Sequence, residues 1–175
     1  MTIPEIDSAL KTLTVLADTR EQDTPLFRKR LQRIGLPAKR RKLDFGDYSC
    51  SVMADGTEID LSVSFAIERK MSLDELAQCY TRGRKRFERE FMRAKASGAK
   101  LYLLIEDATW ESAYSGLYRT QMHPHSLIAS MTAWLARYDC QMLMCKAGTT
   151  PSLIHDICYR EAKEYLERMC DESNL

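Results

Sequence analysis

The 175-residue sequence contains no apolar run long enough to span a lipid bilayer, which requires roughly 20 consecutive residues. Its first dozen residues also lack the basic start and the apolar centre of a secretory signal peptide. Six cysteines without an export signal are more typical of reduced thiols than of a disulfide framework. We therefore expect a soluble cytoplasmic protein with no membrane partner, nucleoid-associated if its source is a bacterium or a phage.

Several common site patterns are also missing. The chain has no phosphate-binding loop, no dinucleotide-binding glycine pattern, no Ser-His-Asp arrangement and no internal repeat. His123 and His125, with Cys140 and Cys145, could be drawn as a zinc site, but neither a CxxC nor a helical HxxxH spacing is present. Pro124 more simply begins a helix, so the sequence favours no zinc site.

Apolar strand-like runs alternate with amphipathic segments along the chain. Strands are expected at 13–17, 101–105 and 141–145, and helices at 24–34, 72–77, 83–97, 124–135 and 150–166. This alternation around a central hairpin predicts an α/β fold with a mixed central sheet flanked by helices. The expected organisation is a flexible N-terminus at 1–12, one domain at 13–170 and a tail at 171–175.

The central hairpin is predicted from two stretches, 47–52 and 61–68, in which residues alternate with the period of a half-buried strand. If they pair antiparallel with Asp47 opposite Glu68, the turn centres near Thr57, inside the polar segment ADGTEID. In that register the small and polar residues share one sheet face, and the large apolar residues share the other.

Asp47, Glu68 and Lys70 fall on the face of small residues. Hard divalent cations such as Mg²⁺ take oxygen ligands, so two carboxylates plus a substrate phosphate are a sufficient set. Lys70 could hold an attacking water or offset charge on a phosphoryl transition state, whereas Arg69 points to the opposite face. The pattern predicts a metal-dependent phosphodiester hydrolase site.

The net charge of +1 hides an asymmetry. Residues 1–100 hold 20 basic and 15 acidic residues, against 6 and 10 in residues 101–175. Basic runs at 28–42 and 82–95 flank the predicted site, which favours a polyanionic partner. The alternative is a solvated helix face followed by a charged edge strand. The DNA-binding candidates are Lys39, Arg40, Arg41, Arg82, Arg84, Lys85 and Arg86.

The same residues carry a resemblance to a known family. Gly46-Asp47, then Glu68-Arg69-Lys70, then Asp74 after three residues, are similar to the GD...ERKxxxD signature of the XPF family of structure-specific DNA endonucleases, which includes archaeal Hef. The segment Asp18-Thr19-Arg20-Glu21 resembles the strand end D-x-R-E of that family. The likeness covers roughly residues 13 to 165 and extends through the basic segment at 83–84 and through LYLLIED.

The resemblance implies a restriction-endonuclease-like fold, dependence on Mg²⁺ or Mn²⁺, and cleavage of branched or flapped DNA. It implies Asp47 and Glu68 as metal ligands, Lys70 as catalytic and Asp18 as a further acidic member of the metal site. The supporting residues that it implies are Arg20, Glu21, Arg69 and Asp74. Two simpler roles stay open, because Asp74 suits a helix start and Asp18 suits a strand-end turn.

The sequence departs from the family in lacking recognisable helicase and helix-hairpin-helix parts, so we expect a stand-alone nuclease domain. The expected function is metal-dependent, structure-specific DNA endonuclease activity in repair or recombination. The alternatives are a catalytically silent DNA-binding partner subunit and a structural domain that binds no DNA. We expect a homodimer or a partner subunit, because aromatic residues are frequent in the second half and members of the family pair through their nuclease domains.

Overall fold

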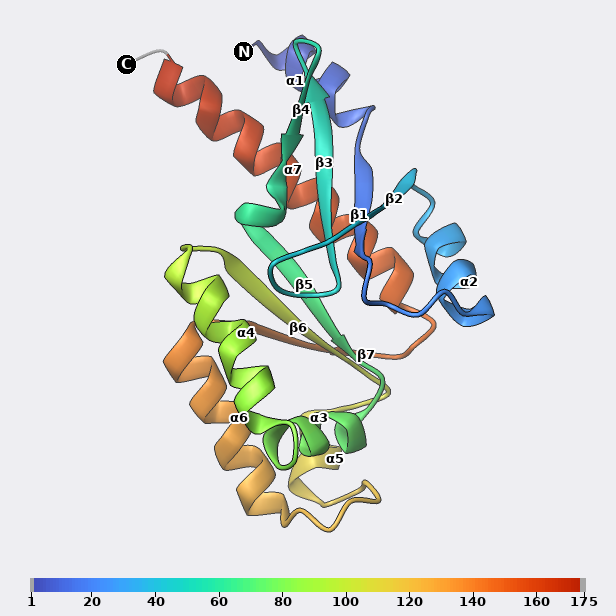
Figure 1. The fold of residues 1–175 in the computed structure, drawn as a ribbon, viewed down its shortest axis with the longest axis vertical. Helices are drawn as coiled ribbons and strands as arrows, with labels where there is room; N and C mark the ends of the chain where they lie inside the picture. Colours follow the sequence, from blue (N-terminus) through green and yellow to red (C-terminus); the bar gives the residue numbers. More distant parts are fainter. Residues whose placement is uncertain (1, 174–175) are drawn as a thin grey trace. The chain divides into compact units, whose positions relative to one another are not determined.

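A computed structural model describes residues 2–173, drawn in Figure 1. The chain forms two compact units. The first unit comprises Met1–Leu43, Asp47–Phe65 and Pro151–Leu175, and the second comprises Asp44–Gly46 and Ala66–Thr150. The extent of a single nuclease domain at 13–170 stays a prediction.

The first unit has a mixed sheet. Its elements are α1 (Ile3–Leu10), β1 (Thr14–Asp18), α2 (Pro25–Ile34), β2 (Ala38–Arg41), β3 (Tyr48–Ala54), β4 (Thr57–Asp60), a 3₁₀ turn (Leu61–Val63) and most of α7 (Thr150–Ser173). Strand β1 pairs parallel with β2 and antiparallel with β3, and β3 pairs antiparallel with β4. The charged strand β2 therefore lies beside β1 with its side chains mostly exposed.

Helix α7 packs against β3 through two buried thiols. Cys50 Sγ donates to the carbonyl of Cys158 at 3.6 Å, and Cys158 Sγ donates to the carbonyl of Ser49 at 3.7 Å. The hydrogen bond with Cys158, and then burial, raise the pKa of Cys50 well above its ordinary value. All six cysteines are thiols in the structure.

The flexible N-terminus expected at 1–12 is contradicted by helix α1. Ile6, Ala9 and Leu10 are buried, and Glu5 accepts a hydrogen bond from the N–H of Thr2 at 2.6 Å. The sequence pattern missed this helix because a single two-turn amphipathic segment gives little periodic signal. At the other end of the chain, α7 runs to Ser173, so part of the expected tail is helical, and residues 174–175 lie outside the described residues.

The predicted hairpin turn is displaced. Asp55 and Gly56 have φ values of +50° and +75°, which suit the two-residue turn favoured by an Asp-Gly pair, and β3 therefore pairs with β4. Asp60 then accepts from the N–H of Ser62 and starts the 3₁₀ turn, so the second predicted strand does not begin at 61. Strand β5 begins only at Phe65.

The face of small residues on β3 is covered. Ser49 and Ser51 are 0% and 2% exposed, so β3 is buried on both faces, where a half-buried strand was expected. Ser49 Oγ donates to the carbonyl of Phe65 at 2.8 Å, and Ser51 Oγ donates to Glu58 Oε1 at 2.9 Å. These bonds satisfy the two hydroxyls that the covered face buries.

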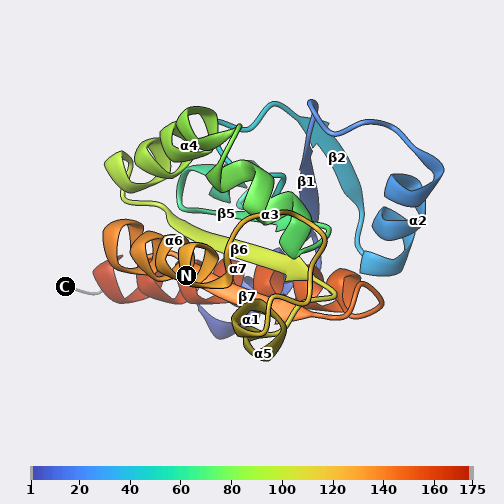
Figure 2. The same cartoon turned by 90° about the horizontal axis from the view of Figure 1, so that it is seen from below.

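The second unit contains three strands and four helices. They are β5 (Phe65–Lys70), α3 (Leu73–Tyr80), α4 (Arg84–Ala96), β6 (Lys100–Glu106), α5 (Trp110–Tyr114), α6 (Pro124–Tyr138) and β7 (Gln141–Cys145). The strand order is β5-β6-β7, with β6 and β7 parallel. Helices α3, α4 and α6 lie side by side (Figure 2). They meet around the fully buried Trp134, whose ring contacts Tyr80, Phe87 and Phe91.

The α/β class with a mixed sheet flanked by helices is confirmed. Helix α2 begins after Thr24, which accepts from the N–H of Phe27, and ends at Gly35 in the left-handed region, as predicted. The short helix α5 was not predicted. Its start depends on reciprocal bonds between Thr109 and Ser112, a weak pattern in a serine-rich stretch. Within residues 2–173, no helix combines the length and the apolar character needed to cross a membrane.

Candidate active site

Glu68 and Lys70 lie on β5 two residues apart, so their side chains project from the same side of the strand. They are 4% and 8% exposed and form an ion pair. Lys70 Nζ also lies 3.9 Å from Glu75 Oε1 and 5.1 Å from the centre of the Phe87 ring. The structure brings Glu68 and Lys70 together, as their spacing predicts.

This pair opens onto a cavity of about 440 Å³ in the second unit. The cavity lies between β5, helix α3, helix α4 and the turn that joins the two helices. Its charged lining consists of Glu68, Lys70, Glu75, Arg82, Arg86 and Glu90. Carboxylates and cations therefore alternate around one recess, where a phosphate group and a cation could bind together.

The pKa of Glu68 is raised from 4.5 to about 7. Burial is the main cause. Lys70 opposes it, and the charges of Glu90 and Glu75 add to it. A carboxyl group held near neutrality by its surroundings is a frequent feature of catalytic sites. A divalent cation would favour the ionised form of Glu68 in place of the proton.

The donor set of the cavity fits Mg²⁺ or Mn²⁺. Glu68, Glu75 and Glu90 contribute carboxylate oxygens, which hard cations prefer, and no soft ligand other than Cys79 lines the recess. Within residues 2–173, however, no three acidic, histidine or cysteine side chains are grouped closely enough to hold a metal ion by themselves. Water and substrate phosphate would have to complete the shell, as is common for Mg²⁺. Among the described residues, His123, His125, Cys140 and Cys145 form no such group either.

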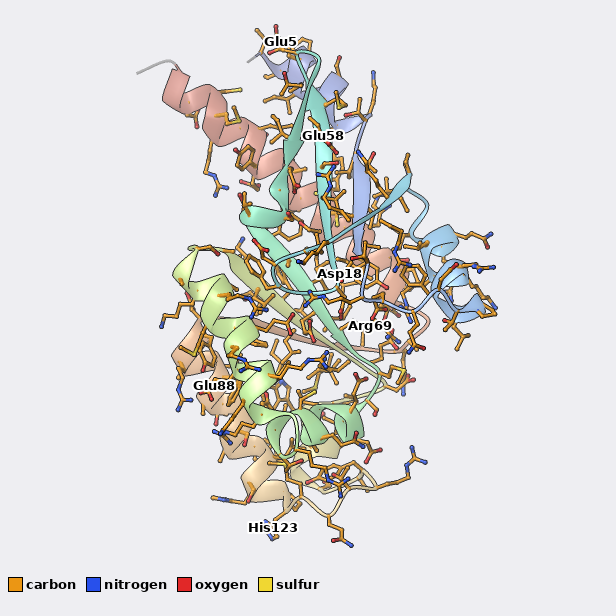
Figure 3. The ribbon with its side chains drawn as sticks, viewed as in Figure 1. Glu5, Asp18, Glu58, Arg69, Glu88 and His123 are labelled. Atoms are coloured by element: carbon orange, nitrogen blue, oxygen red, sulfur yellow. The ribbon has the colours of Figure 1, made fainter. Side chains whose placement is uncertain are left out.

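Arg69 points away from the cavity and pairs with Glu106 at the end of β6. Its Nε lies 2.8 Å from Glu106 Oε1, and its Nη2 lies 2.5 Å from Oε2. Both side chains are nearly buried, with Glu106 6% and Arg69 12% exposed. Figure 3 labels Arg69 on β5. The bidentate pair ties the strand that carries Glu68 and Lys70 to its neighbour.

In the first unit, Asp18 ends β1 and is 1% exposed (Figure 3). Its carboxylate accepts from the N–H of Arg20, from the Arg20 guanidinium at 2.8 and 2.9 Å, and from the N–H of Leu43 at 2.8 Å. Burial alone would raise the pKa of Asp18, but the bonds from Arg20 and Leu43 outweigh it, so the pKa is lowered. These contacts support the strand-end role that the sequence left open, and they leave Asp18 little room as a metal ligand.

The neighbouring acidic residues of the first unit are also engaged. The carbonyl of Asp47 accepts from the N–H of Asp18 at 2.8 Å, which fixes the start of β3 beside the end of β1. Glu21 Oε2 lies 3.8 Å from Arg30 Nη1. Asp47 belongs to the first unit and Glu68 to the second, so their pairing across the hairpin stays a prediction.

Asp74 lies in the first turn of α3 and contacts the loop after α5. Its Oδ1 accepts from the N–H of Arg119 at 2.7 Å and from the N–H of Thr120 at 2.9 Å. Arg119 Nε lies 3.5 Å from Oδ2. The contacts make Asp74 an anchor for this loop, and it does not line the cavity of Glu68.

Sequence reasoning missed Glu90. It follows Arg86 by four positions and Phe87 by three, so helical spacing places all three on one face of α4. Glu90 Oε1 accepts from the N–H of Gly46 at 3.2 Å. Gly46 has φ +72°, and a Cβ there would lie 2.7 Å from Ala66 Cβ, which explains the glycine of the GD motif.

The two basic runs differ in their partners. In the first run Lys39 and Arg41 pair with Glu58, and Arg41 also pairs with Asp60. Arg40 donates to two carbonyls near the end of β1. In the second run a cleft of about 590 Å³ is lined by Thr81, Arg82, Arg84, Lys85, Arg86 and Arg89.

Comparison with known proteins gives the class. Residues 17–151 match the ERCC4 domain family. No curated protein sequence is significantly similar to the chain. Among solved structures, XPF from Aeropyrum pernix is similar with TM-score 0.58 and 20% identity, over 87% of this chain and 61% of that one. XPF from Aeropyrum pernix in complex with DNA gives TM-score 0.60 and 20% identity, over 86% and 65% of the two chains.

The chain therefore belongs to the ERCC4 domain family. At 20% identity the structural likeness establishes the fold, which is that of an XPF nuclease domain. The chain spans about two thirds or less of the length of the XPF chains that it matches.

Proposed function

We propose that the chain is a Mg²⁺- or Mn²⁺-dependent, structure-specific DNA endonuclease that hydrolyses phosphodiester bonds near branches, flaps or junctions during repair or recombination. The observation that carries the proposal is the buried Glu68–Lys70 pair in the wall of a cavity that Arg82 and Arg86 also line. The ERCC4 domain match and the XPF structure in complex with DNA support DNA as the substrate.

In this proposal Glu68 would hold the metal, and Asp47 stays the predicted second ligand. When bound, the metal would polarise a phosphoryl oxygen and favour hydroxide over water as the nucleophile. Lys70 donates from Nζ to the attacking water or to a non-bridging phosphate oxygen, where it offsets the negative charge that develops as the phosphorus–oxygen bonds rearrange. Its contact with Phe87 and its pairing with Glu68 hold the ammonium group ready in place.

The remaining predicted residues act as positioning groups. Arg69 holds β5 through Glu106, Asp74 holds the loop at 119–120, and Arg20 with Glu21 supports the end of β1. These residues support cleavage without touching the substrate, because Glu68 and Lys70 can act only when β5 holds them in a fixed position.

A catalytically silent DNA-binding subunit is the second candidate. One observation favours the silent subunit. The Asp18 carboxylate already accepts hydrogen bonds from Arg20 and from the N–H of Leu43. The two candidates predict the same DNA binding and differ only in cleavage. Flap, fork, nicked and linear duplexes with labelled ends, incubated with Mn²⁺ or with EDTA, separate them. Cleavage near the branch only with Mn²⁺ supports the nuclease, and binding without cleavage on every substrate supports the silent subunit.

We also propose self-association into a homodimer. Tyr114 and Leu117 are 64% and 73% exposed, although Met131 and Trp134 are core residues and give no surface to an interface. Light scattering at micromolar concentration should report about twice the 20.2 kDa chain mass. A measured mass of 20.2 kDa at every concentration would contradict the homodimer and favour a different protein as the partner subunit.

A further inference from the structure

The second basic run contains cations that the protein does not neutralise. Arg82, Lys85, Arg86 and Arg89, which we name the α4 cluster, line the cleft of about 590 Å³ at the start of α4. All four side chains are exposed. Within the part of the chain that the structure describes, none of them forms an ion pair.

The acidic residues of α4 do not neutralise this cluster. Glu88 Oε1 lies 3.1 Å from Arg137 Nη1 and accepts from the hydroxyl of Tyr138 at 3.0 Å. Glu90 accepts from the N–H of Gly46. Because no carboxylate lines the cleft of the α4 cluster, its cations repel one another there, and a bound anion would relieve that repulsion.

The first basic run behaves in the opposite way. Arg28 pairs with Asp23 at 2.8 Å, and Lys39 and Arg41 pair with Glu58 at 3.3 and 2.8 Å. The pKa of Glu58 is lowered to about 2, first by Arg41 and then by Ser51. A phosphate contact with Lys39 or Arg41 would have to compete with an ion pair that already exists.

The position of the α4 cluster points to its ligand. Arg82 and Arg86 line both this cleft and the cavity of Glu68 and Lys70, so the two recesses are neighbours within the second unit. A phosphodiester chain that enters the cavity would pass directly along the cluster, with its phosphates matched to a row of guanidinium and ammonium groups.

Building on the proposed function, we propose that the α4 cluster binds the DNA backbone beside the scissile phosphate, and that the run 28–42 contributes little to DNA affinity. Arg82 and Arg86 contact the phosphates next to the cavity, and Lys85 and Arg89 contact those further along the cleft. If each cation neutralises one phosphate of duplex DNA, the cluster contributes about −3.6 to the slope of log affinity against log salt.

Three double variants with the same loss of two positive charges test this inference. They are Lys85→Gln with Arg89→Gln in the cluster, Lys39→Gln with Arg41→Gln in the first run, and Arg160→Gln with Lys163→Gln on α7, where each cation pairs with a glutamate four residues later. Binding to labelled flap DNA is measured by fluorescence anisotropy in EDTA, from 50 to 200 mM salt. Melting temperatures within a few degrees of wild type confirm that each variant folds.

The cluster variant should flatten the salt slope by about 1.8 and weaken binding about 60-fold at 0.1 M salt. The other two variants should change affinity less than about 3-fold. Equal weakening in all three would show that only net charge matters, and a larger loss in the Lys39 variant would move the site to the first run. Displacement of DNA by millimolar inorganic phosphate would assign the cleft to a small anion. Each of these results overturns the inference.

Because these measurements use EDTA, they are independent of catalysis. A wild-type protein that cleaves nothing with Mn²⁺ but shows the predicted pattern of binding would refute the nuclease proposal and retain the backbone site. The double variant Arg82→Gln with Arg86→Gln removes the two cations that line both recesses. This pair should lower single-turnover cleavage at saturating protein as well as affinity, whereas the Lys85 and Arg89 pair should lower affinity alone.

Discussion

The Glu68→Gln variant tests the electrostatics of the candidate site most sharply. In metal-free buffer the folded protein holds the pKa of Glu68 at about 7, against an ordinary value of 4.5, chiefly because the carboxyl group is buried. Ionised Glu68 therefore lowers the stability of the folded state by about 3 kcal/mol once the pH is above both values. Glutamine keeps the shape and can still accept a hydrogen bond from Lys70.

The sign follows from the direction of the pKa change. A carboxyl group with a raised pKa in the folded state costs no stability below pH 4.5; the cost grows as the pH rises from 4.5 to about 7 and is constant above that. The free energy of unfolding of Glu68→Gln relative to wild type should therefore increase by up to about 3 kcal/mol between pH 5 and pH 8. The pKa of about 7 already includes the opposing effect of Lys70.

Urea unfolding in EDTA at pH 5, 6, 7 and 8, followed by tryptophan fluorescence, measures the difference. A matched control is Glu111→Gln, an exposed glutamate on α5 whose replacement should have the same small effect at every pH. The reasoning is refuted if Glu68→Gln becomes less stable relative to wild type as the pH rises. That result would mean that ionised Glu68 gains more from Lys70 than it loses by burial.

Two further predictions concern the framework of the site. Gly46→Ala should destabilise the protein by about 2–4 kcal/mol in denaturant unfolding, because its Cβ would lie 2.7 Å from Ala66 Cβ. The control Gly56→Ala has a similar positive φ but no neighbour within 4 Å, so it should cost only about 1 kcal/mol. Equal losses in the two variants would contradict the steric argument. Glu58→Gln should cost about 0.5–1 kcal/mol at pH 7, a value reduced for its solvent exposure, because Arg41 lowers the pKa of Glu58 to about 2. That stabilisation is present above pH 4.5 and is lost as the pH falls toward 2. A difference in the free energy of unfolding between wild type and variant that stays constant from pH 6 to pH 3 would contradict it.

Most of the fold could be predicted because its elements carry local signals. Helix α2 has a threonine cap and a glycine stop, and the continuous apolar run of β6 fits a buried strand. The hairpin could not be placed, because period-two alternation fits several registers and the Asp-Gly pair at 55–56 selects a shorter turn than the one expected.

The candidate site was predictable only where spacing along one element decides it. Glu68 and Lys70 share a side of β5 because a strand has period two. Glu90 was missed because its place in the cavity depends on how α4 packs, which local spacing does not fix. The ion-pair partners of the basic residues could not be predicted either, because Glu58 pairs with Lys39 although the two lie far apart in sequence.

The central claim is that the site containing Glu68 hydrolyses DNA. The direct measurement is the single-turnover rate on a labelled flap duplex with Mn²⁺, for wild type, Asp47→Ala, Glu68→Gln and the control Glu111→Gln. We expect wild type and the control to cut near the branch at the same rate, and both site variants to be slower by about 1,000-fold or more while binding the flap with unchanged affinity. Cleavage by Glu68→Gln at the wild-type rate would contradict the account.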